Sequence, residues 1–326
     1  MCFVRARRGD QIVSTTYGRS SGFCIDPIEK KPLYHFLPGT AVLSFGTAGC
    51  NLACKFCQNW SISKARTHQR LQSPASPRQL AVAARSTGCR SVAYTYNDPV
   101  IFLEYAVDVA TACREEGIRN VAVTAGYICA PARADLFGAM DAVNVDLKSF
   151  TEEFYWRQTG GHIEPVKETI VWLVHETQVW VEITTLLIPG LNDNAAEIHK
   201  LCGWVAETLG PRVPLHFSAF HPDWKMANRE ATSSHSLIQA KQIAAEYGLH
   251  YVYIGNREIP AARTTFCPGC GEALVRRAGY EVREWAISRE AGRSLCAGCA
   301  TEVDGVFEEG PESWGNRRQA VDPSQF

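Results

Sequence analysis

Between residues 39 and 260, short apolar runs alternate with longer stretches in which apolar residues recur every three or four positions. A short apolar run bounded by turn residues is typical of a buried strand, and the longer spacing is typical of a helix with one buried face. The predicted strands are 41–45, 91–95, 118–124, 142–147, 179–188, 213–219 and 250–254. The predicted helices are 76–84, 98–117, 131–138, 151–158, 166–176, 194–209 and 234–247.

This alternation predicts an α/β domain built from right-handed βαβ units around a parallel sheet. Seven strands favour a (β/α) barrel, full or incomplete, over a doubly wound sheet, although spacing alone allows either. In both folds ligands bind at the carboxyl ends of the strands. Outside this domain we expect an irregular N-terminal extension (1–38), a cysteine-containing module (261–307) and a mobile polar tail (308–326).

Three cysteines, Cys50, Cys54 and Cys57, follow the first predicted strand at C-x3-C-x2-C spacing. Gly46 and Gly49 place them on a loop at the end of that strand. A simple 4Fe–4S site takes four cysteines, so three thiolates would leave one iron open to another ligand. The alternative is a zinc site or three unrelated buried cysteines, but zinc motifs favour C-x2-C pairs. The loop therefore predicts a 4Fe–4S cluster with an open iron.

Polar side chains stand at or near the ends of several predicted strands. They are Tyr96, Asn97, Asp98, Asp146, Lys148, Thr184, Thr185, His216, Ser218, His221 and Asn256. Any one of them alone could be a helix cap or a satisfied polar group inside a barrel. Together they place acidic and cationic groups around one rim, which suits a zwitterionic ligand.

Four further cysteines form two C-x2-C pairs separated by 25 residues: Cys267, Cys270, Cys296 and Cys299. This spacing predicts a metal site, and the module has too little apolar content to fold without its metal. We expect a zinc ribbon with a hairpin over 273–287. A rubredoxin-like iron or an auxiliary iron–sulfur cluster is the alternative.

The composition excludes some classes of function. The 326 residues are 46% hydrophobic and 21% charged, with a formal net charge of -1. This charge gives no global reason to expect nucleic acid or a membrane surface as a partner. No apolar run approaches the roughly 18 residues of a membrane-spanning helix. Thirteen cysteines, seven of them at metal-ligand spacing, favour a reducing cytoplasm over a disulfide framework.

The C-x3-C-x2-C loop resembles the signature of radical S-adenosylmethionine (SAM) enzymes. Further segments extend the likeness over roughly residues 3–307. Segments 95–99 (TYNDP), 146–148 (DLK), 184–193 (TTLLIPGLND), 216–222 (HFSAFHP) and 253–256 (YIGN) resemble AmmeMemoRadiSam-system radical SAM enzymes. These are relatives of the pyruvate formate-lyase activating enzyme, which residues 146–160 also resemble. The resemblance implies a radical SAM partial (β/α) barrel over 39–260, followed by the zinc-ribbon-like module.

The resemblance also implies site residues. Cys50, Cys54 and Cys57 would hold the cluster, whose open iron is chelated by the amino and carboxylate groups of SAM. Phe56 stands where the superfamily places an apolar residue near the adenine.

Two polar segments of the barrel match SAM-binding motifs in the same way. Tyr96, Asn97 and Asp98 stand at the place of the superfamily's Gly-Gly-Glu turn, which binds the amino end of SAM. Asp146 and Lys148 match its Asp-x-Lys pair, and Lys148 is the candidate partner of the SAM carboxylate. The remaining implied cofactor contacts are Thr185, His216 and Asn256, the last two toward the ribose and adenine.

Three features depart from the family pattern. The family usually has Glu where Asp98 stands, so the carboxylate of Asp98 extends less far from the backbone than that of the family's Glu. It usually has Asn-Gly where Ala125-Gly126 stands, so one polar rim contact is expected to be missing. Members often begin earlier, before a Gly-x-Cys-x-Val-Arg stretch that residues 1–5 (MCFVR) resemble in part. The chain is therefore expected to be short, or misassigned, at its start.

The sequence thus predicts a radical SAM enzyme. Reductive cleavage of SAM would give a 5′-deoxyadenosyl radical that abstracts hydrogen from an unidentified substrate, with an activase-like reaction as one option. The expected partners are a reductase such as flavodoxin or ferredoxin, and Memo-type and AMMECR-type proteins. The alternative is a metal-dependent binding module on a catalytically degenerate barrel. Ribbon arginines could give it a basic face, but the interleaved glutamates predict a mixed, solvated surface.

Overall fold

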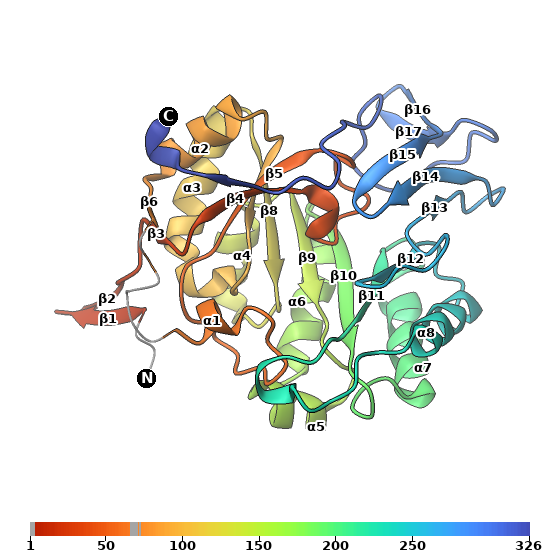
Figure 1. The fold of residues 1–326 in the computed structure, drawn as a ribbon, viewed down its shortest axis with the longest axis horizontal. Coiled ribbons are helices and arrows are strands. Elements are labelled where there is room, and N and C mark those ends of the chain that lie inside the picture. Colours follow the sequence, from red (N-terminus) through yellow and green to blue (C-terminus); the bar gives the residue numbers. More distant parts are fainter. Residues whose placement is uncertain (1–3, 66–70, 72) are drawn as a thin grey trace.

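A curved nine-stranded sheet forms the centre of the molecule (Figure 1). The computed structural model describes residues 4–65, 71 and 73–326. In this described part, the strand order is β12-β11-β10-β9-β8-β7-β5-β4-β18. Seven of these strands run parallel: β5 (Ala41–Phe45), β7 (Ser91–Tyr94), β8 (Arg119–Thr124), β9 (Ala142–Asp146), β10 (Trp180–Leu187), β11 (Leu215–Ala219) and β12 (Val252–Gly255). They match the predicted strands to within a few residues at each end.

The described strands form an open barrel, because β12 and β18 lie at opposite edges of the sheet. The partial (β/α) barrel predicted from the sequence is therefore confirmed. Helices cover its outer face (Figure 1). They are α2 (Pro77–Ser86), α3 (Leu103–Glu115), α4 (Ala130–Phe137), α6 (Glu164–Glu176), α7 (Ala195–Trp204) and α8 (Ser234–Glu246), whereas the short helices α1 (Trp60–Ser63) and α5 (Glu152–Phe154) lie in the loops that follow β5 and β9.

Local sequence signals explain where these helices begin and continue. Ser76 and Gln79 form a reciprocal capping box at the start of α2, with Pro77 as its first residue. The helix predicted over 98–117 opens instead with a 3-10 turn, Pro99–Phe102, and the Asp98 carboxylate accepts from the Val100 N–H at its start. Two other predicted helices end in π-helical turns, so α5 and α7 are shorter than expected.

The N-terminal segment contributes a strand to the main sheet, which corrects the expectation of an irregular extension. Strand β4 (Phe23–Pro27) is buried at every position and pairs antiparallel with β5. The strand ends with Asp26-Pro27. The rest of the segment forms β1 (Arg5–Arg8), β2 (Gln11–Ser14) and β3 (Arg19–Ser20), the last paired with β6 (Ser73–Pro74). Residues 1–3, which carry part of the expected family stretch, lie outside the described residues.

The C-terminal segment is also ordered into the fold, although a mobile tail was expected. Strand β18 (Gln319–Val321) pairs antiparallel with β4 at the edge of the main sheet. The chain then ends in a 3-10 turn, Pro323–Gln325, beside α2 (Figure 1). The polar composition misled the prediction because an edge strand needs backbone pairing more than apolar side chains.

The module after residue 260 is a small β structure set against one end of the barrel (Figure 1). Its three-stranded sheet contains β13 (Thr265–Phe266), β14 (Ala273–Ala278) and β15 (Glu281–Trp285), so the predicted hairpin is confirmed. A second hairpin contains β16 (Ile287–Glu290) and β17 (Arg293–Cys296). We call this module, residues 261–307, the ribbon.

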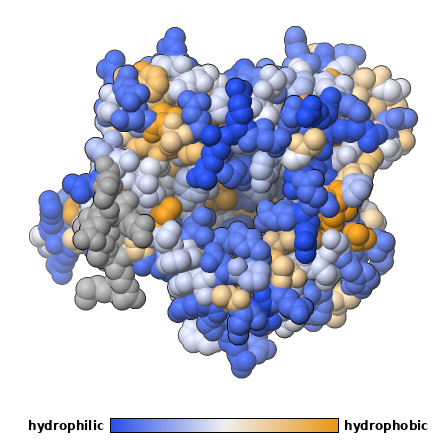
Figure 2. All heavy atoms as spheres, in the orientation of Figure 1, coloured by the Kyte–Doolittle hydropathy of each residue, from blue (hydrophilic) through white to orange (hydrophobic). Residues whose placement is uncertain are grey.

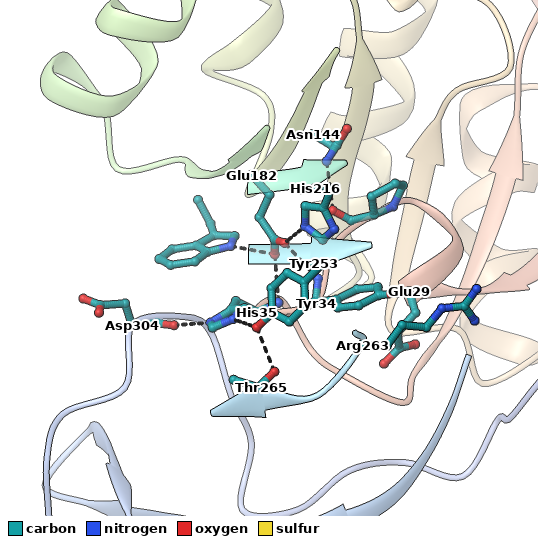
Figure 3. A network of polar contacts seen from close by, with 12 residues as sticks. Glu29, Tyr34, His35, Asn144, Glu182, His216, Tyr253, Arg263, Thr265 and Asp304 are labelled. Carbon is teal, nitrogen blue, oxygen red and sulfur yellow. Dashed lines mark hydrogen bonds and ion pairs between the residues drawn. The ribbon is translucent and has the colours of Figure 1, made fainter. Parts of the chain in front are cut away.

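A buried polar network joins the ribbon to the floor of the barrel (Figure 3). Glu182 on β10 accepts hydrogen bonds from the backbone N–H groups of Tyr34 and His35, at 3.0 and 2.8 Å, and from His216 Nε2 at 2.7 Å. Arg277 of the ribbon donates to the Tyr34 carbonyl at 2.7 Å. The segment before β5 therefore plugs the amino end of the barrel, opposite the end at which the cysteine loop lies.

His35 is held in this network as a neutral imidazole. Its Nδ1 lies 2.6 Å from the Asp304 carbonyl oxygen, which can only accept a hydrogen bond, so Nδ1 carries the proton. Its Nε2 then accepts from the Tyr253 hydroxyl at 2.6 Å. Burial lowers the pKa of His35 from 6.5 to about 4, against the opposing effect of the Glu182 carboxylate.

This buried imidazole predicts a pH-dependent stability. As the pH falls from about 6.5 toward 4, the unfolded chain binds a proton that the folded chain does not, so the free energy of unfolding decreases. We expect His35 to account for a loss of about 2 kcal/mol at about pH 5 relative to pH 7.5. Urea unfolding of wild type and His35→Gln at both pH values measures it. An equal pH dependence in the two proteins would contradict the prediction.

Candidate active site

The three loop cysteines lie at the carboxyl end of β5 and line one cavity of about 250 Å³. Other sequence-predicted residues line the same cavity: Phe56, Tyr96, Asn97, Asp98, Asp146, Lys148 and Asn256. The fold thus brings together, at the ends of the four strands β5, β7, β9 and β12, most of the residues that the sequence singled out. This is the end of a parallel barrel at which ligands bind.

A π-helical turn supports the cysteine loop from one side. The backbone N–H groups of Ala53 and Lys55 donate to the carbonyl oxygens of Thr159 and Gln158, at 2.6 and 2.9 Å. Both carbonyls belong to the turn Tyr155–Thr159, which ends the segment that resembles the activating enzyme. These bonds fix the loop between its cysteines.

Asn97 and Asp98 are engaged by the protein, which changes the role expected for them. Asn97 Nδ2 donates to the Gly49 carbonyl at 2.8 Å, at the start of the cysteine loop. The Asp98 carboxylate accepts from the Ala125 N–H at 2.8 Å and from the Thr124 hydroxyl at 3.0 and 3.1 Å. Both side chains line the cavity, but they serve first to tie the ends of neighbouring strands together. The Asp98 contact to residue 125 uses the backbone, so the Ala125 departure does not affect it.

Lys148 and Asp146 form an ion pair in the cavity wall, with Nζ and Oδ2 2.9 Å apart. Burial alone would favour the neutral amine, but the Asp146 carboxylate raises the pKa of Lys148 above its usual range. The Nζ atom also lies 6.0 Å from the centroid of the Phe56 ring, on the cysteine loop. The cavity therefore contains a fixed cation beside the cysteines.

Two residues of the cavity wall have a left-handed backbone without being glycine. Tyr96 has φ of 69° and Asn256 has φ of 60°. Asparagine tolerates this region, whereas for tyrosine it costs about 1 kcal/mol or more and must be imposed by the surroundings. At Tyr96 the conformation agrees with the resemblance, because the related motif has glycine at this position.

Thr185 and His216, which were expected to contact the cofactor, lie away from the cavity. The Thr185 hydroxyl donates to the Leu147 carbonyl at 2.8 Å, on the helix-facing side of β10. His216 lies deeper in the barrel, where it pairs with Glu182 (Figure 3). Thr184 lines the cavity instead, and its hydroxyl has no hydrogen-bond partner in the described structure.

Asp26 is a residue near the site that the sequence did not reveal. It is fully buried on β4, and the Tyr96 hydroxyl donates to its Oδ2 at 2.9 Å. The available signal was the pair of lysines four and five residues later, because both lysines bind this carboxylate.

The cavity fits the donor set of a three-cysteine cluster with bound SAM. Its thiols come from one loop, and burial raises the pKa of Cys54 to about 12, so a metal would have to displace the proton. Lys148 supplies a cation for a carboxylate, and the unpartnered Thr184 hydroxyl supplies a polar group in the wall. Cys50, Cys54 and Cys57 would hold the cluster, and Lys148 would face the carboxylate of SAM.

The four ribbon cysteines converge on one point. Their sulfur atoms all lie within 4.8 Å of one another, with Cys267 and Cys299 3.6 Å apart and Cys270 and Cys296 3.8 Å apart. A tetrahedral ion with metal–sulfur bonds of about 2.3 Å places its ligands about 3.8 Å apart. The geometry therefore suits a single metal ion better than a sulfide-bridged cluster, whose inorganic core would separate the cysteines further.

Comparison with known proteins agrees with the fold. The sequence model of the Radical SAM superfamily matches residues 45–202, which include the cysteine loop and the Asp146–Lys148 pair. Among solved structures, a radical SAM methyltransferase from Sphaerobacter thermophilus shares the fold with a TM-score of 0.54 and 17% identity, over 73% of this chain and 71% of that one. Residues 45–202 therefore form a Radical SAM domain, and the protein is an enzyme.

Two curated relatives extend the comparison. The chain is 36% identical to the "Uncharacterized protein MJ0808" of Methanocaldococcus jannaschii over 306 residues. This alignment covers 94% of this chain and 90% of that protein. It is 24% identical over 179 residues to GTP 3′,8-cyclase of Peptoclostridium acidaminophilum, 54% of each chain. The first relative shares nearly the whole chain, so its likeness includes β4 and the ribbon.

None of the described helices is both long and apolar enough to cross a bilayer. On the face drawn in Figure 2, hydrophobic residues occur in small groups among hydrophilic ones.

Proposed function

We propose that this enzyme binds a 4Fe–4S cluster and SAM in the 250 Å³ cavity and cleaves SAM reductively to initiate hydrogen abstraction from a substrate. When bound, the cluster and SAM supply the 5′-deoxyadenosyl radical chemistry. The observation that carries the proposal is that the three loop cysteines and the Lys148 cation line one cavity. The match of residues 45–202 to the Radical SAM superfamily supports it.

The chain's own residues would orient the cofactor and exclude water. Lys148, fixed by Asp146, would bind the SAM carboxylate. Phe56 is buried on the cysteine loop, and its ring centroid lies 5.7 Å from that of Phe154. It would present an apolar surface to the cofactor. Asn97 would hold the entrance of the cysteine loop in place.

The proposal extends to the protein partners of the enzyme, the metal of the ribbon and the cellular location. We infer an AmmeMemoRadiSam-system role with Memo-type and AMMECR-type proteins, and an activase-like reaction, from the resemblance of segments such as 184–193 and 146–160. A flavodoxin or ferredoxin would supply the electron. We also infer zinc in the ribbon, because the sulfur spacing suits a single tetrahedral ion. A cytoplasmic location is supported by the free thiol of every cysteine in the described residues.

The structure gives little support to the alternative of a binding module on a degenerate barrel. A basic face on the ribbon would need exposed, unpaired arginines. Arg277 is instead buried, and Arg276 pairs with Glu284 at 2.7 Å. The cavity also retains its cysteines and its cation.

Replacing Lys148 tests the proposed SAM site. We expect Lys148→Met to weaken SAM binding by about tenfold to a hundredfold, because a charged hydrogen bond is lost. Equilibrium dialysis of labelled SAM against cluster-loaded protein measures this. Lys167→Met is the matched control, since Lys167 pairs with Glu164 at 2.9 Å outside the cavity. Equal binding by both variants and wild type would contradict the role of Lys148.

A further inference from the structure

Tyr96 needs support from outside its own turn. Its left-handed backbone, with φ of 69°, is unfavourable for a residue with a β-carbon. Residues 95–98 form one wall of the proposed SAM cavity, so the shape of that wall depends on this conformation. The turn contains one backbone hydrogen bond of its own, from the Asn97 N–H to the Thr95 carbonyl at 2.9 Å.

Asp26 supplies that support through the Tyr96 side chain. The Tyr96 hydroxyl donates to Asp26 Oδ2 at 2.9 Å. Asp26 is fully buried and accepts from the ammonium groups of Lys30 and Lys31, each at 2.7 Å. Burial opposes the charge, but the two lysines lower the pKa of Asp26 to about 2, so the acceptor is ionised at neutral pH. A hydrogen bond to an ionised acceptor is stronger than one between neutral groups.

The same lysine cluster also contacts the tyrosine ring. Lys31, whose side chain is 3% exposed, places its Nζ 4.9 Å from the centroid of the Tyr96 ring. Tyr96 is thus held both at its hydroxyl and at its ring. Side-chain contacts of this strength can offset the backbone cost of the left-handed turn.

The supporting residues come from outside the matched superfamily region. Asp26 lies on β4, before residue 45, where the match begins. Arg318, just before β18, approaches Asp26 Oδ1 at 3.9 Å and Cys24 Sγ at 3.2 Å. The two antiparallel strands added to the barrel therefore lie behind the cavity wall formed by Tyr96.

We propose that Asp26 is a positioning residue for SAM binding, which acts by holding Tyr96 in the left-handed conformation that shapes the cavity wall. This inference rests on the proposed function. It explains why a tyrosine stands where the related motif has glycine: the conformation that glycine adopts freely is imposed here by a charged partner on β4. Asp26 itself does not touch the ligand in this account.

The test compares Asp26→Asn in two backgrounds. In the wild-type background we expect SAM binding to weaken by about tenfold, because the charged acceptor is lost. In the Tyr96→Gly background we expect Asp26→Asn to change binding by less than about twofold, because glycine adopts a positive φ without support. SAM binding to cluster-loaded protein, by dialysis and by the change in the spectrum of the reduced cluster, is the readout.

Each outcome separates the inference from the proposed function. If wild type binds SAM and Asp26→Asn binds it equally well, or if the loss is the same in both backgrounds, the inference is wrong and the proposed function stands. If cluster-loaded wild type does not bind SAM, the proposed function itself is contradicted. Asp108→Asn is the control, since Asp108 accepts from the Tyr17 hydroxyl away from the cavity.

A second variant is needed in case Asp26→Asn fails to fold, because the substitution leaves the buried Lys31 without its anionic partner. Tyr96→Phe removes only the hydroxyl, and we expect it to weaken SAM binding by about fivefold while cluster content and melting temperature stay near wild type. Unchanged SAM binding in Tyr96→Phe would overturn the inference.

Discussion

Cys54→Ala protein is expected to retain less than about a tenth of the iron and sulfide that wild type incorporates on anaerobic reconstitution. A 4Fe–4S cluster with three protein ligands has no spare cysteine, so the loss of one leaves two irons without protein support. Cys54 is also buried, with 7% of its surface exposed, so water replaces its thiolate poorly. The effect should be the largest of any single substitution in the cavity.

Iron and sulfide analysis, together with the spectrum of the reduced protein, measures this loss. Cys129→Ala is the matched control, because Cys129 is an exposed free thiol at the start of α4. Its cluster content should equal that of wild type. A full cluster in Cys54→Ala would show that the loop does not hold the cluster in the proposed way.

The second large effect is expected in the ribbon. Cys296→Ser should lose the metal ion that we propose for the ribbon and unfold that module, because structural zinc contributes on the order of 10 kcal/mol to the folding of such small domains. The ribbon's own apolar core is small: Cys267, Leu274, Val275, Ile287, Cys296, Val303 and Phe307.

Unfolding of the ribbon should also destabilise the barrel. Arg277 would leave the Tyr34 carbonyl. The Thr265 hydroxyl would leave Tyr253 (Figure 3), so the segment that closes the amino end of the barrel would be held less firmly. We expect a lower melting temperature and less than about 0.1 ribbon metal ion per chain by elemental analysis.

The two cysteine variants serve as controls for each other. Cys296→Ser should still assemble the cluster, and Cys54→Ala should keep the ribbon metal. Wild-type metal content and melting in Cys296→Ser would contradict a structural metal site.

The parallel strands and the cysteine loop could be predicted because each has a strong local signal. Strands such as 41–45 and 142–147 are short apolar runs bounded by turns, and a parallel sheet buried on both faces requires such runs. The three cysteines lie within eight residues of one another, so their convergence does not depend on the rest of the fold.

The position of polar residues on β10 could have been predicted better. Glu182 and Thr184 alternate with Val181 and Ile183, and a period of two places the former pair in the barrel and the latter pair against the helices. Thr185 continues the helix-facing set by the same period, and it is Thr184 that lines the cavity. Assigning Thr185 to the cavity was therefore an error of one position, which reverses the face of a strand residue.

The contribution of the chain ends could not be predicted, because it depends on pairing between distant segments. β4 and β18 are separated by almost the whole chain, yet Ala320 lies opposite Cys24 in the sheet. Asp26 showed nothing unusual in the sequence beyond its neighbouring lysines, since its partner Tyr96 lies 70 residues away. Such long-range pairs become visible only once the fold is known.

Reductive cleavage of SAM is the most direct test of the account. The wild-type protein, reconstituted anaerobically and reduced with dithionite, would be assayed for 5′-deoxyadenosine, with Cys50→Ala as the control. We expect product from wild type and none from Cys50→Ala. Absence of product from wild-type protein with a complete cluster and bound SAM, or equal product from Cys50→Ala, would contradict the account.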